Sequence, residues 1–537
     1  MRSRISVCVA ATGAHVAAAA CALFAPSAFA QATATPAGGV SGTEAVPAQP
    51  PTEETIPANQ GPASYSGPVA PTTDEWKFSW NGYFRAPMRI GLAKRDNPGP
   101  GQSNRTLHSP FLTDDQYLNW NYTRQWEKDW SEVFFNYGNS KVTGTVGFGA
   151  YNLTDAGTQD PHGQFGLQQA YVTWRPDAKV DHLRIEVKVG SFWNKYGMAG
   201  KYDAGKYDTY VFGRTHTMGE LVGLEYDVSD FTFKISEGFG TRGEQANIGT
   251  APTVGTTGFT LLSHFHGGIA YKNFAEIGLH YLTSWCQDAR VEGPGDQGAD
   301  GQVAITGVEG RLNGGVLGYL WVGYSHVKAT HEAIVGPAIE VLHSLNTDAT
   351  LNMTNQFFGG RGDGTLNTLS VQYDYSFGTL WRKIQNPNSS FWGDGPDVIL
   401  SLFGMYTTVS SPATDPATGA ALVNPMTGRA WDGVKKLKFG TDLVAFPFAW
   451  LGAGFRYDKV QPDVHDSSQS FWVISPKIVF RSAFITHEEI TVQYSKYTYG
   501  THVYPQPPNG PDPGSAPTAT AQRPDENVFG VKATMWW

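Results

Sequence analysis

Cysteine is scarce in this chain of 537 residues, which contains only Cys8, Cys21 and Cys286. The first two lie in an N-terminal segment that has the features of a secretory signal, so Cys286 would stand alone after cleavage. A single cysteine forms no intramolecular disulfide and supplies no cysteine-based metal site. The exported chain must therefore be held together by other interactions.

Charge and long apolar runs are also lacking. Charged residues make up 16% of the chain, against about 25% in soluble domains. No window approaches the roughly 18 consecutive apolar residues of a membrane helix. Aromatic residues, by contrast, reach 13%, and there are 62 glycines. Because only helices and closed barrels satisfy every backbone polar group in lipid, this composition predicts an all-β fold, a transmembrane antiparallel β-barrel.

The first 72 residues are predicted to lie outside the barrel. Arg2 and Arg4 precede an Ala-rich apolar stretch, and Ala28-Phe29-Ala30 is a small-x-small cleavage site, so residues 1–30 are expected to be a signal peptide. Residues 31–72 are mostly Pro, Ala, Thr and Gly and cannot bury enough apolar surface to offset their ordering entropy. We expect a disordered periplasmic segment there, followed by the barrel at 73–537.

Net charge argues against one class of partner. Removal of the two N-terminal arginines leaves 37 basic and 48 acidic residues, a change in net charge from −9 to −11. An acidic balance of this kind disfavours nucleic acid as a partner.

Side-chain polarity alternates in segments of about ten residues. Residues 183–189, Leu-Arg-Ile-Glu-Val-Lys-Val, carry aliphatic side chains at odd positions and charged ones at even positions. This period of two is typical of barrel strands that face lipid on one side and the lumen on the other. We predict about eighteen strands, with sixteen as the alternative, at 76–92, 128–138, 141–152, 164–175, 182–191, 218–228, 230–238, 257–271, 274–285, 301–312, 315–328, 365–376, 396–409, 433–446, 449–460, 468–480, 488–499 and 526–537.

Short and long connections alternate between these strands. Short turns are predicted at Gly138-Asn139-Ser140, Ser229, Lys272-Asn273 and Pro447-Phe448, where Gly and Asn tolerate positive φ and Pro presets its own φ. Long loops are predicted at 93–127, 192–217, 286–300, 329–364, 410–432 and 500–525. An even strand number places both termini on the periplasmic side, with the long loops outside. Residues 377–395 break the pattern, because they are long where a short turn is expected.

The last strand resembles the C-terminal targeting signature of outer-membrane proteins. Phe529, Val531, Ala533, Met535 and Trp537 share one face, and an aromatic residue ends the chain. The resemblance implies that the barrel-assembly machinery recognises this strand, and that outer-membrane lipid of a Gram-negative bacterium surrounds the barrel.

Two shorter segments resemble substrate-selective porins. Residues 81–85, Asn-Gly-Tyr-Phe-Arg, look like the opening of maltoporins, and 189–192, Val-Gly-Ser-Phe, are similar to both maltoporins and phosphate-selective porins. Eighteen strands is the maltoporin number, whereas sixteen would favour general or phosphate-selective porins. The resemblance implies a homotrimeric channel for passive diffusion of small hydrophilic solutes.

By the same resemblance, the loop 192–217 is the candidate for a pore constriction, because in porins a loop after an early strand folds into the lumen. The alternative is a solvated extracellular loop that never enters the pore. The constriction candidates are its charged and tyrosine side chains: Lys195, Tyr196, Lys201, Tyr202, Asp203, Lys206, Tyr207, Asp208, Tyr210 and Arg214.

Charged residues opposite the aliphatic strand faces are predicted to line the lumen, because Arg or Lys on the lipid face costs about 2–4 kcal/mol at mid-bilayer. The basic set is Arg85, Arg89, Arg175, Arg184, Lys188, Lys234, Lys436, Lys438, Arg456, Lys477 and Arg481. The acidic set is Glu186, Glu225, Glu276, Asp374, Asp442 and Asp458. Eleven basic against six acidic residues predict a mild anion preference, unless these groups pair with one another.

No motif for catalysis or cofactor binding is found. The chain contains no phosphate-binding loop and no zinc-protease helix motif, and no arrangement identifies a catalytic triad. His264 and His266 share a strand face but have no evident third ligand. We therefore expect no enzyme, no cofactor and no metal. The hypotheses are a porin with anion or sugar preference, a non-conducting structural or adhesive barrel, and an outer-membrane hydrolase.

Overall fold

The computed structural model describes residues 73–92, 112–113, 117–118, 130–151, 164–195, 214–241, 259–272, 274–287, 301–330, 364–378, 396–410, 434–461, 464, 467, 470–482, 487–500 and 525–536. The predicted signal peptide and Pro-rich segment, residues 1–72, lie outside these ranges, as does Trp537. Expectations for them stay predictions.

Nearly all described residues belong to β-strands. The strands are β1 (Lys77–Gly91), β2 (Trp130–Gly138), β3 (Val142–Tyr151), β4 (Gln164–Trp174), β5 (Leu183–Lys195), β6 (Arg214–Val228), β7 (Phe231–Thr241), β8 (Phe259–Tyr271), β9 (Ala275–Gln287), β10 (Gly301–Asn313), β11 (Tyr319–Thr330), β12 (Gly364–Ser376), β13 (Asp397–Ser410), β14 (Val434–Phe448), β15 (Leu451–Gln461), β16 (Phe471–Ser482), β17 (His487–Tyr499) and β18 (Glu526–Trp536). Within the described ranges, no helix has the length and apolar character needed to cross a membrane.

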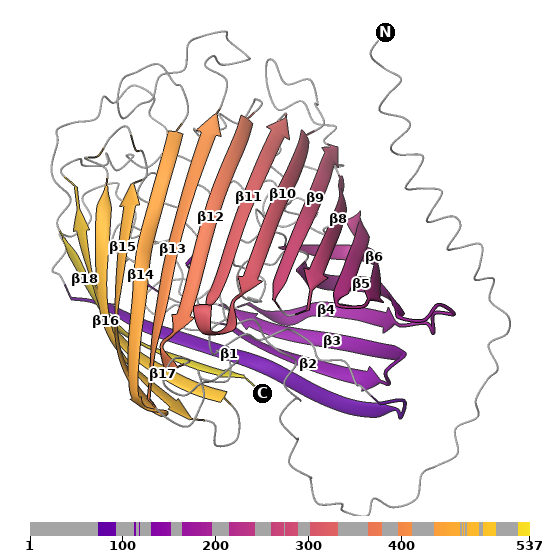
Figure 1. Ribbon diagram of the computed structural model, residues 1–537, viewed down its shortest axis with the longest axis horizontal. Helices are drawn as coiled ribbons and strands as arrows, with labels where there is room; N and C mark the ends of the chain where they lie inside the picture. Colours follow the sequence, from indigo (N-terminus) through magenta and orange to yellow (C-terminus); the bar gives the residue numbers. More distant parts are fainter. Residues whose placement is uncertain are drawn as a thin grey trace, which may run out of the picture. The chain divides into compact units, whose positions relative to one another are not determined.

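The strands form one closed sheet. Each pairs antiparallel with its neighbours in the chain, and β1 pairs with both β2 and β18. The closing register runs from Tyr83 opposite Trp536 to Gly91 opposite Val528. Figure 1 shows β10 to β14 side by side in one part of the wall. The predicted antiparallel barrel is confirmed, with eighteen strands rather than sixteen.

The two faces of the wall differ in polarity. Along β7, exposed side chains alternate with less exposed ones, and Phe231, Phe233 and Ile235 point outward. On β14, the outward Phe439 and Leu443 are exposed, whereas the inward Lys438 and Asp442 are buried. This is the division between a lipid-facing surface and a polar interior that the alternation predicts.

Two of the predicted short turns adopt positive φ at residues that are neither Gly nor Asn. Ser229, between β6 and β7, has φ of 54°, and Lys272, between β8 and β9, has φ of 47°. The predicted tolerance of Gly and Asn for positive φ therefore does not explain these two turns. Their positions are nevertheless correct, since both lie between paired strands.

Three predictions at strand ends are wrong, and the remaining strand ends lie within three residues of the predicted ones. Pro447 and Phe448 belong to β14, whose pairing with β15 becomes irregular between Ala445 and Phe448, and the turn follows at 449–450. Proline has no backbone N–H to donate to a neighbouring strand. Pro447 is accommodated because the irregular pairing at this point does not require that hydrogen bond. The strand predicted from 315 begins with a short 3-10 helix, Gly315–Leu317. The loop predicted at 192–217 is shorter, because β5 extends to 195 and β6 begins at 214.

The long connection predicted at 377–395 falls almost wholly outside the described residues. Only Phe377 and Gly378 are placed, directly after β12. Gly378 N–H donates to Asp397 Oδ1 at 2.7 Å, which brings the start of this connection to the first residue of β13.

Replacement of Leu443 by Arg tests the assignment of the outer face. An arginine at mid-bilayer on the lipid face costs about 2–4 kcal/mol, so L443R should lower the free energy of unfolding from lipid vesicles by about this amount. Urea titration of the vesicle-embedded barrel measures the change, with the volume-conserving L443M as control. Equal stability of L443R and L443M would contradict the assignment.

Candidate functional site: the inner wall of β13–β17

Inward side chains of β14, β15 and β16 form the most charged part of the described wall. Lys436, Lys438 and Asp442 lie on β14, and Arg456 and Asp458 lie on β15, all at most 4% exposed. Lys477 and Arg481 continue the set on β16. The sequence places them here because the strands alternate, so every second side chain points away from the exposed apolar surface.

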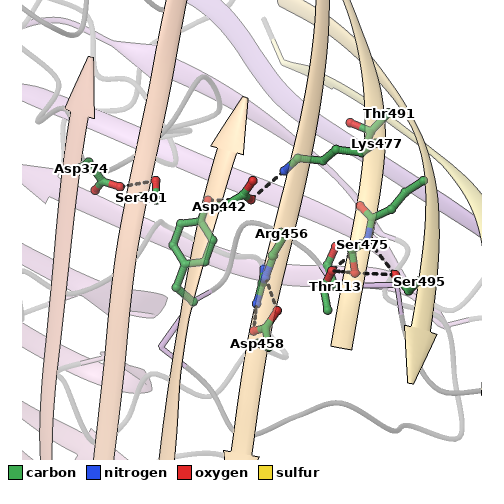
Figure 2. Close-up of polar contacts among 12 residues, drawn as sticks. Thr113, Asp374, Ser401, Asp442, Arg456, Asp458, Ser475, Lys477, Thr491 and Ser495 are labelled. Atoms are coloured by element: carbon green, nitrogen blue, oxygen red, sulfur yellow. Dashed lines mark hydrogen bonds and ion pairs between the residues drawn. The ribbon is translucent and has the colours of Figure 1, made fainter. Parts of the chain in front are cut away.

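These charges are paired within the wall (Figure 2). Arg456 holds Asp458 on the same strand through two hydrogen bonds of 2.7 and 2.6 Å. Lys477 Nζ lies 2.6 Å from Asp442 Oδ2. Removing one partner of such a buried pair leaves an uncompensated charge, which costs more than the intact pair gains. The pairs therefore fix the positions of both signs of charge along the wall.

A part of the connection between β1 and β2 is docked against this wall. The docked residues are Leu112, Thr113, Tyr117 and Leu118, and Thr113 and Leu118 are buried.

Hydrogen bonds hold the docked residues to three strands. Thr113 Oγ1 donates to Ser475 Oγ at 2.8 Å on β16, and Gln493 Nε2 of β17 donates to the Thr113 carbonyl at 2.9 Å. Lys438 Nζ of β14 donates to the Tyr117 carbonyl at 2.8 Å. The Ser475 hydroxyl is also hydrogen-bonded to the Ser495 hydroxyl of β17, with 2.8 Å between the two oxygens.

The Tyr117 ring forms an aromatic and cationic stack. It lies parallel to Phe403 of β13, with ring centroids 4.7 Å apart and an interplanar angle of 15°. The Arg456 guanidinium carbon lies 5.0 Å from both centroids, within the range of cation–π attraction. Tyr117 Oη donates to Asp442 Oδ2 at 3.1 Å. Burial, and next Asp442, raise the pKa of the phenol well above its usual range, so it remains a hydrogen-bond donor.

A glycine on the neighbouring strand allows the Phe403 ring to lie flat against the wall. Gly440 is directly opposite Phe403 in the β13–β14 register. A Cβ at this glycine would lie 2.5 Å from Phe403 Cζ. The same arrangement places Phe134 over Gly147, its partner in the β2–β3 register. These glycines keep bulky rings along the wall instead of across the interior.

A second polar cluster lies on β7 to β11. Lys234 Nζ of β7 donates a hydrogen bond to Glu276 Oε1 of β9 at 3.2 Å. Arg311 of β10 forms an ion pair with the same carboxylate. Glu309 accepts a hydrogen bond from Trp321 Nε1 at 3.1 Å. The buried His264 and His266 lie nearby on β8. In the described part of the chain, no three His, Cys, Asp or Glu side chains are arranged to hold a metal ion.

The predicted constriction residues fall almost entirely outside the described residues. This applies to Tyr196, Lys201, Tyr202, Asp203, Lys206, Tyr207, Asp208 and Tyr210. Lys195 and Arg214 are the end residues of β5 and β6 and are opposite each other in that pair, so they belong to the wall and not to a loop. Their role in a constriction stays a prediction.

The remaining predicted wall residues are placed as follows. Arg85 and Arg89 lie on β1, and Arg85 is buried. Arg184 pairs with Glu225 and Asp227, and Arg175 pairs with Glu186. Lys188 lies 5.3 Å from the Tyr171 centroid and 5.4 Å from the Phe192 centroid.

Sequence reasoning missed two groups of residues. Within the described ranges, inward positions also hold the acidic Glu132, Asp227, Glu309, Asp397, Glu489 and Glu526 and the basic Lys77, Arg311 and Lys532. With these residues, the inner wall has fourteen basic and twelve acidic side chains, compared with the predicted eleven and six. The docked residues were missed as well. The apolar pairs Phe111-Leu112 and Tyr117-Leu118 in a polar loop were the available signal.

Comparisons with known proteins give likeness in fold only. No family model matches the chain, and no curated protein matches it. Among solved structures, OmpT of Vibrio cholerae is 11% identical, with 87% of this chain and 100% of that chain covered and a TM-score of 0.37. The outer-membrane channel DcaP of Acinetobacter baumannii is 10% identical, with 87% and 100% covered and a TM-score of 0.38. OccD3 of Pseudomonas aeruginosa is 9% identical, with 90% and 99% covered and a TM-score of 0.37.

At these identities and scores the likeness says nothing about whether the chain transports a solute. It also gives no support to the maltoporin or phosphate-selective subtype suggested by the short segments at 81–85 and 189–192.

Replacement of Tyr117 by Ala tests whether the docking is maintained by this side chain. The variant loses the ring stack with Phe403 and the hydrogen bond to Asp442. Trypsin should therefore cleave the connection between β1 and β2 at least about tenfold faster, because a loss of roughly 1.4 kcal/mol of local stability makes the open state ten times more populated. Tyr494→Ala is the matched control, because it removes an outward tyrosine bonded to Asn527. Equal cleavage of both variants would show that Tyr117 does not hold the connection.

Proposed function

We propose that the chain is an outer-membrane channel through which small hydrophilic solutes diffuse passively. The single observation that carries the proposal is the closed barrel with an apolar outer face and ionisable side chains along its inner face. Charged side chains inside a membrane barrel mark a polar interior that water can enter.

A mild anion preference is part of the proposal. Over the inner wall as a whole, the two signs of charge nearly balance. Around the docked residues, however, the basic Lys436, Lys438, Arg456 and Lys477 outnumber the acidic Asp374, Asp442 and Asp458. Basic side chains around a narrow path favour anions. The Tyr117–Phe403 stack adds an aromatic surface, which would suit the apolar face of a sugar.

Homotrimer assembly and recognition of β18 by the barrel-assembly machinery also belong to the proposal. Phe529 and Met535 face outward on β18, as that recognition signature requires, and Trp537 lies outside the described residues.

Planar-bilayer recording tests the channel directly. The purified chain should give discrete conductance steps and, in a salt gradient, a reversal potential on the anion-selective side. If a folded barrel gives no conductance steps, the non-conducting structural or adhesive barrel is favoured. Cation selectivity would refute the proposed anion preference.

Two neighbouring lysines on β14 provide a matched pair of variants that tests the anion preference. Lys436 is buried on the inner face, whereas Lys435 is exposed on the outer face. Lys436→Gln should move the reversal potential toward the cation-selective side, and Lys435→Gln should leave it unchanged. Equal effects of the two substitutions would contradict the assigned faces.

A further inference from the structure

Polar side chains form a continuous row on the outer face of β11 to β14, at the end where the long loops begin. His326 is opposite Asn367, Asn367 is opposite Thr408, and Thr408 is opposite Lys435. Figure 1 shows these four strands side by side. Neighbouring strands are about 4.8 Å apart, so the row spans roughly 15 Å. We call His326, Asn367, Thr408 and the flanking lysines Lys328 and Lys435 the rim row.

The row lies on the same face as the lipid-facing side chains. On β11 it follows Val322 and Tyr324, which are 39% and 41% exposed, and on β12 it precedes Leu369, which is 50% exposed. Polar groups on this face are costly within hydrocarbon and are tolerated near the interface. The row therefore marks the level at which the apolar surface ends and lipid headgroups begin.

Hydrogen bonds fix the centre of the rim row. Asn367 Oδ1 accepts from Tyr324 Oη at 2.8 Å and lies 2.8 Å from His326 Nδ1. Asn367 Nδ2 donates to Thr408 Oγ1 at 3.4 Å. With Asn367 Oδ1 as acceptor, the His326 bond requires a proton on Nδ1. The centre is thus ordered before any lipid arrives, which lowers the entropy cost of binding.

Positive charge flanks this ordered centre on both sides. Lys328 lies two residues beyond His326 on the same face of β11, and Lys435 ends the row on β14; both are exposed. Between Thr217 and Thr241, the outward charged side chains of β6 and β7 are acidic, Glu220 and Glu237. An anionic partner would therefore be attracted to the rim row and not to that part of the outer surface.

We propose that the rim row binds the phosphate groups of lipopolysaccharide, the phosphorylated glycolipid of the outer leaflet. Lys328 and Lys435 would each contact a phosphate oxygen, and the ordered amide and hydroxyl groups between them would contact sugar hydroxyls. The proposal rests on the outer-membrane placement proposed above. It adds a lipid ligand on the outside of the barrel, independent of transport through it.

Binding of fluorescently labelled lipopolysaccharide to the full chain in detergent tests the proposal. The double variant Lys328→Gln, Lys435→Gln should lose affinity by about fivefold per lysine, the factor for one basic side chain near an anionic surface. Lys328→Arg, Lys435→Arg should retain affinity, because the charge is kept. The matched control is Lys272→Gln, which removes an exposed lysine at the opposite end of the barrel.

Two results would overturn the proposal. One is unchanged affinity of the double Gln variant, and the other is equal binding of dephosphorylated lipopolysaccharide by the unmodified chain. The second comparison needs no variant and so decides the matter even if the Gln variant does not fold. Bilayer conductance of the double variant should equal that of the unmodified chain, so a failure of lipid binding is distinguishable from a failure of the channel function.

Discussion

The need to pair every backbone N–H and C=O group within lipid governs this structure. An unpaired strand edge in hydrocarbon would cost several kcal/mol for each exposed group. The pairing of β1 with β18 removes that edge, and the register between Tyr83 and Trp536 at one end and Gly91 and Val528 at the other defines how the sheet closes. Without this closure none of the other seventeen strand pairs would be stable in a membrane.

Closure determines the side-chain arrangement, because a closed sheet has one face toward lipid and one toward the interior. The paired charges of β14 to β16 lie on the interior face, where Arg456–Asp458 and Lys477–Asp442 compensate each other. Tyr117 reaches the same wall from a distant part of the chain, and its stack with Phe403 depends on the glycine at 440. The rim row occupies the other face, at the level where hydrocarbon ends.

The strands were predictable from the sequence because a period of two in polarity is read from each segment alone. Residues 183–189 show it without reference to any other strand. Turn chemistry was a weaker guide, since the tolerance of Gly and Asn for positive φ does not explain the turns at Ser229 and Lys272, and Pro447 lies within β14. The site was predicted only in part. Thr113 meets Ser475 across 362 residues of sequence, and no local pattern encodes such a contact.

The central claim is that alternate residues of one strand face lipid and the interior. Its most direct measurement is a scan along β14 in lipid vesicles, with Cys8, Cys21 and Cys286 replaced by Ser and a fluorophore attached to single cysteines from 438 to 443. Quenchers carried on lipid chains should quench the fluorophore at 439, 441 and 443 and spare it at 438 and 442. Quenching of similar strength at all these positions would contradict the account.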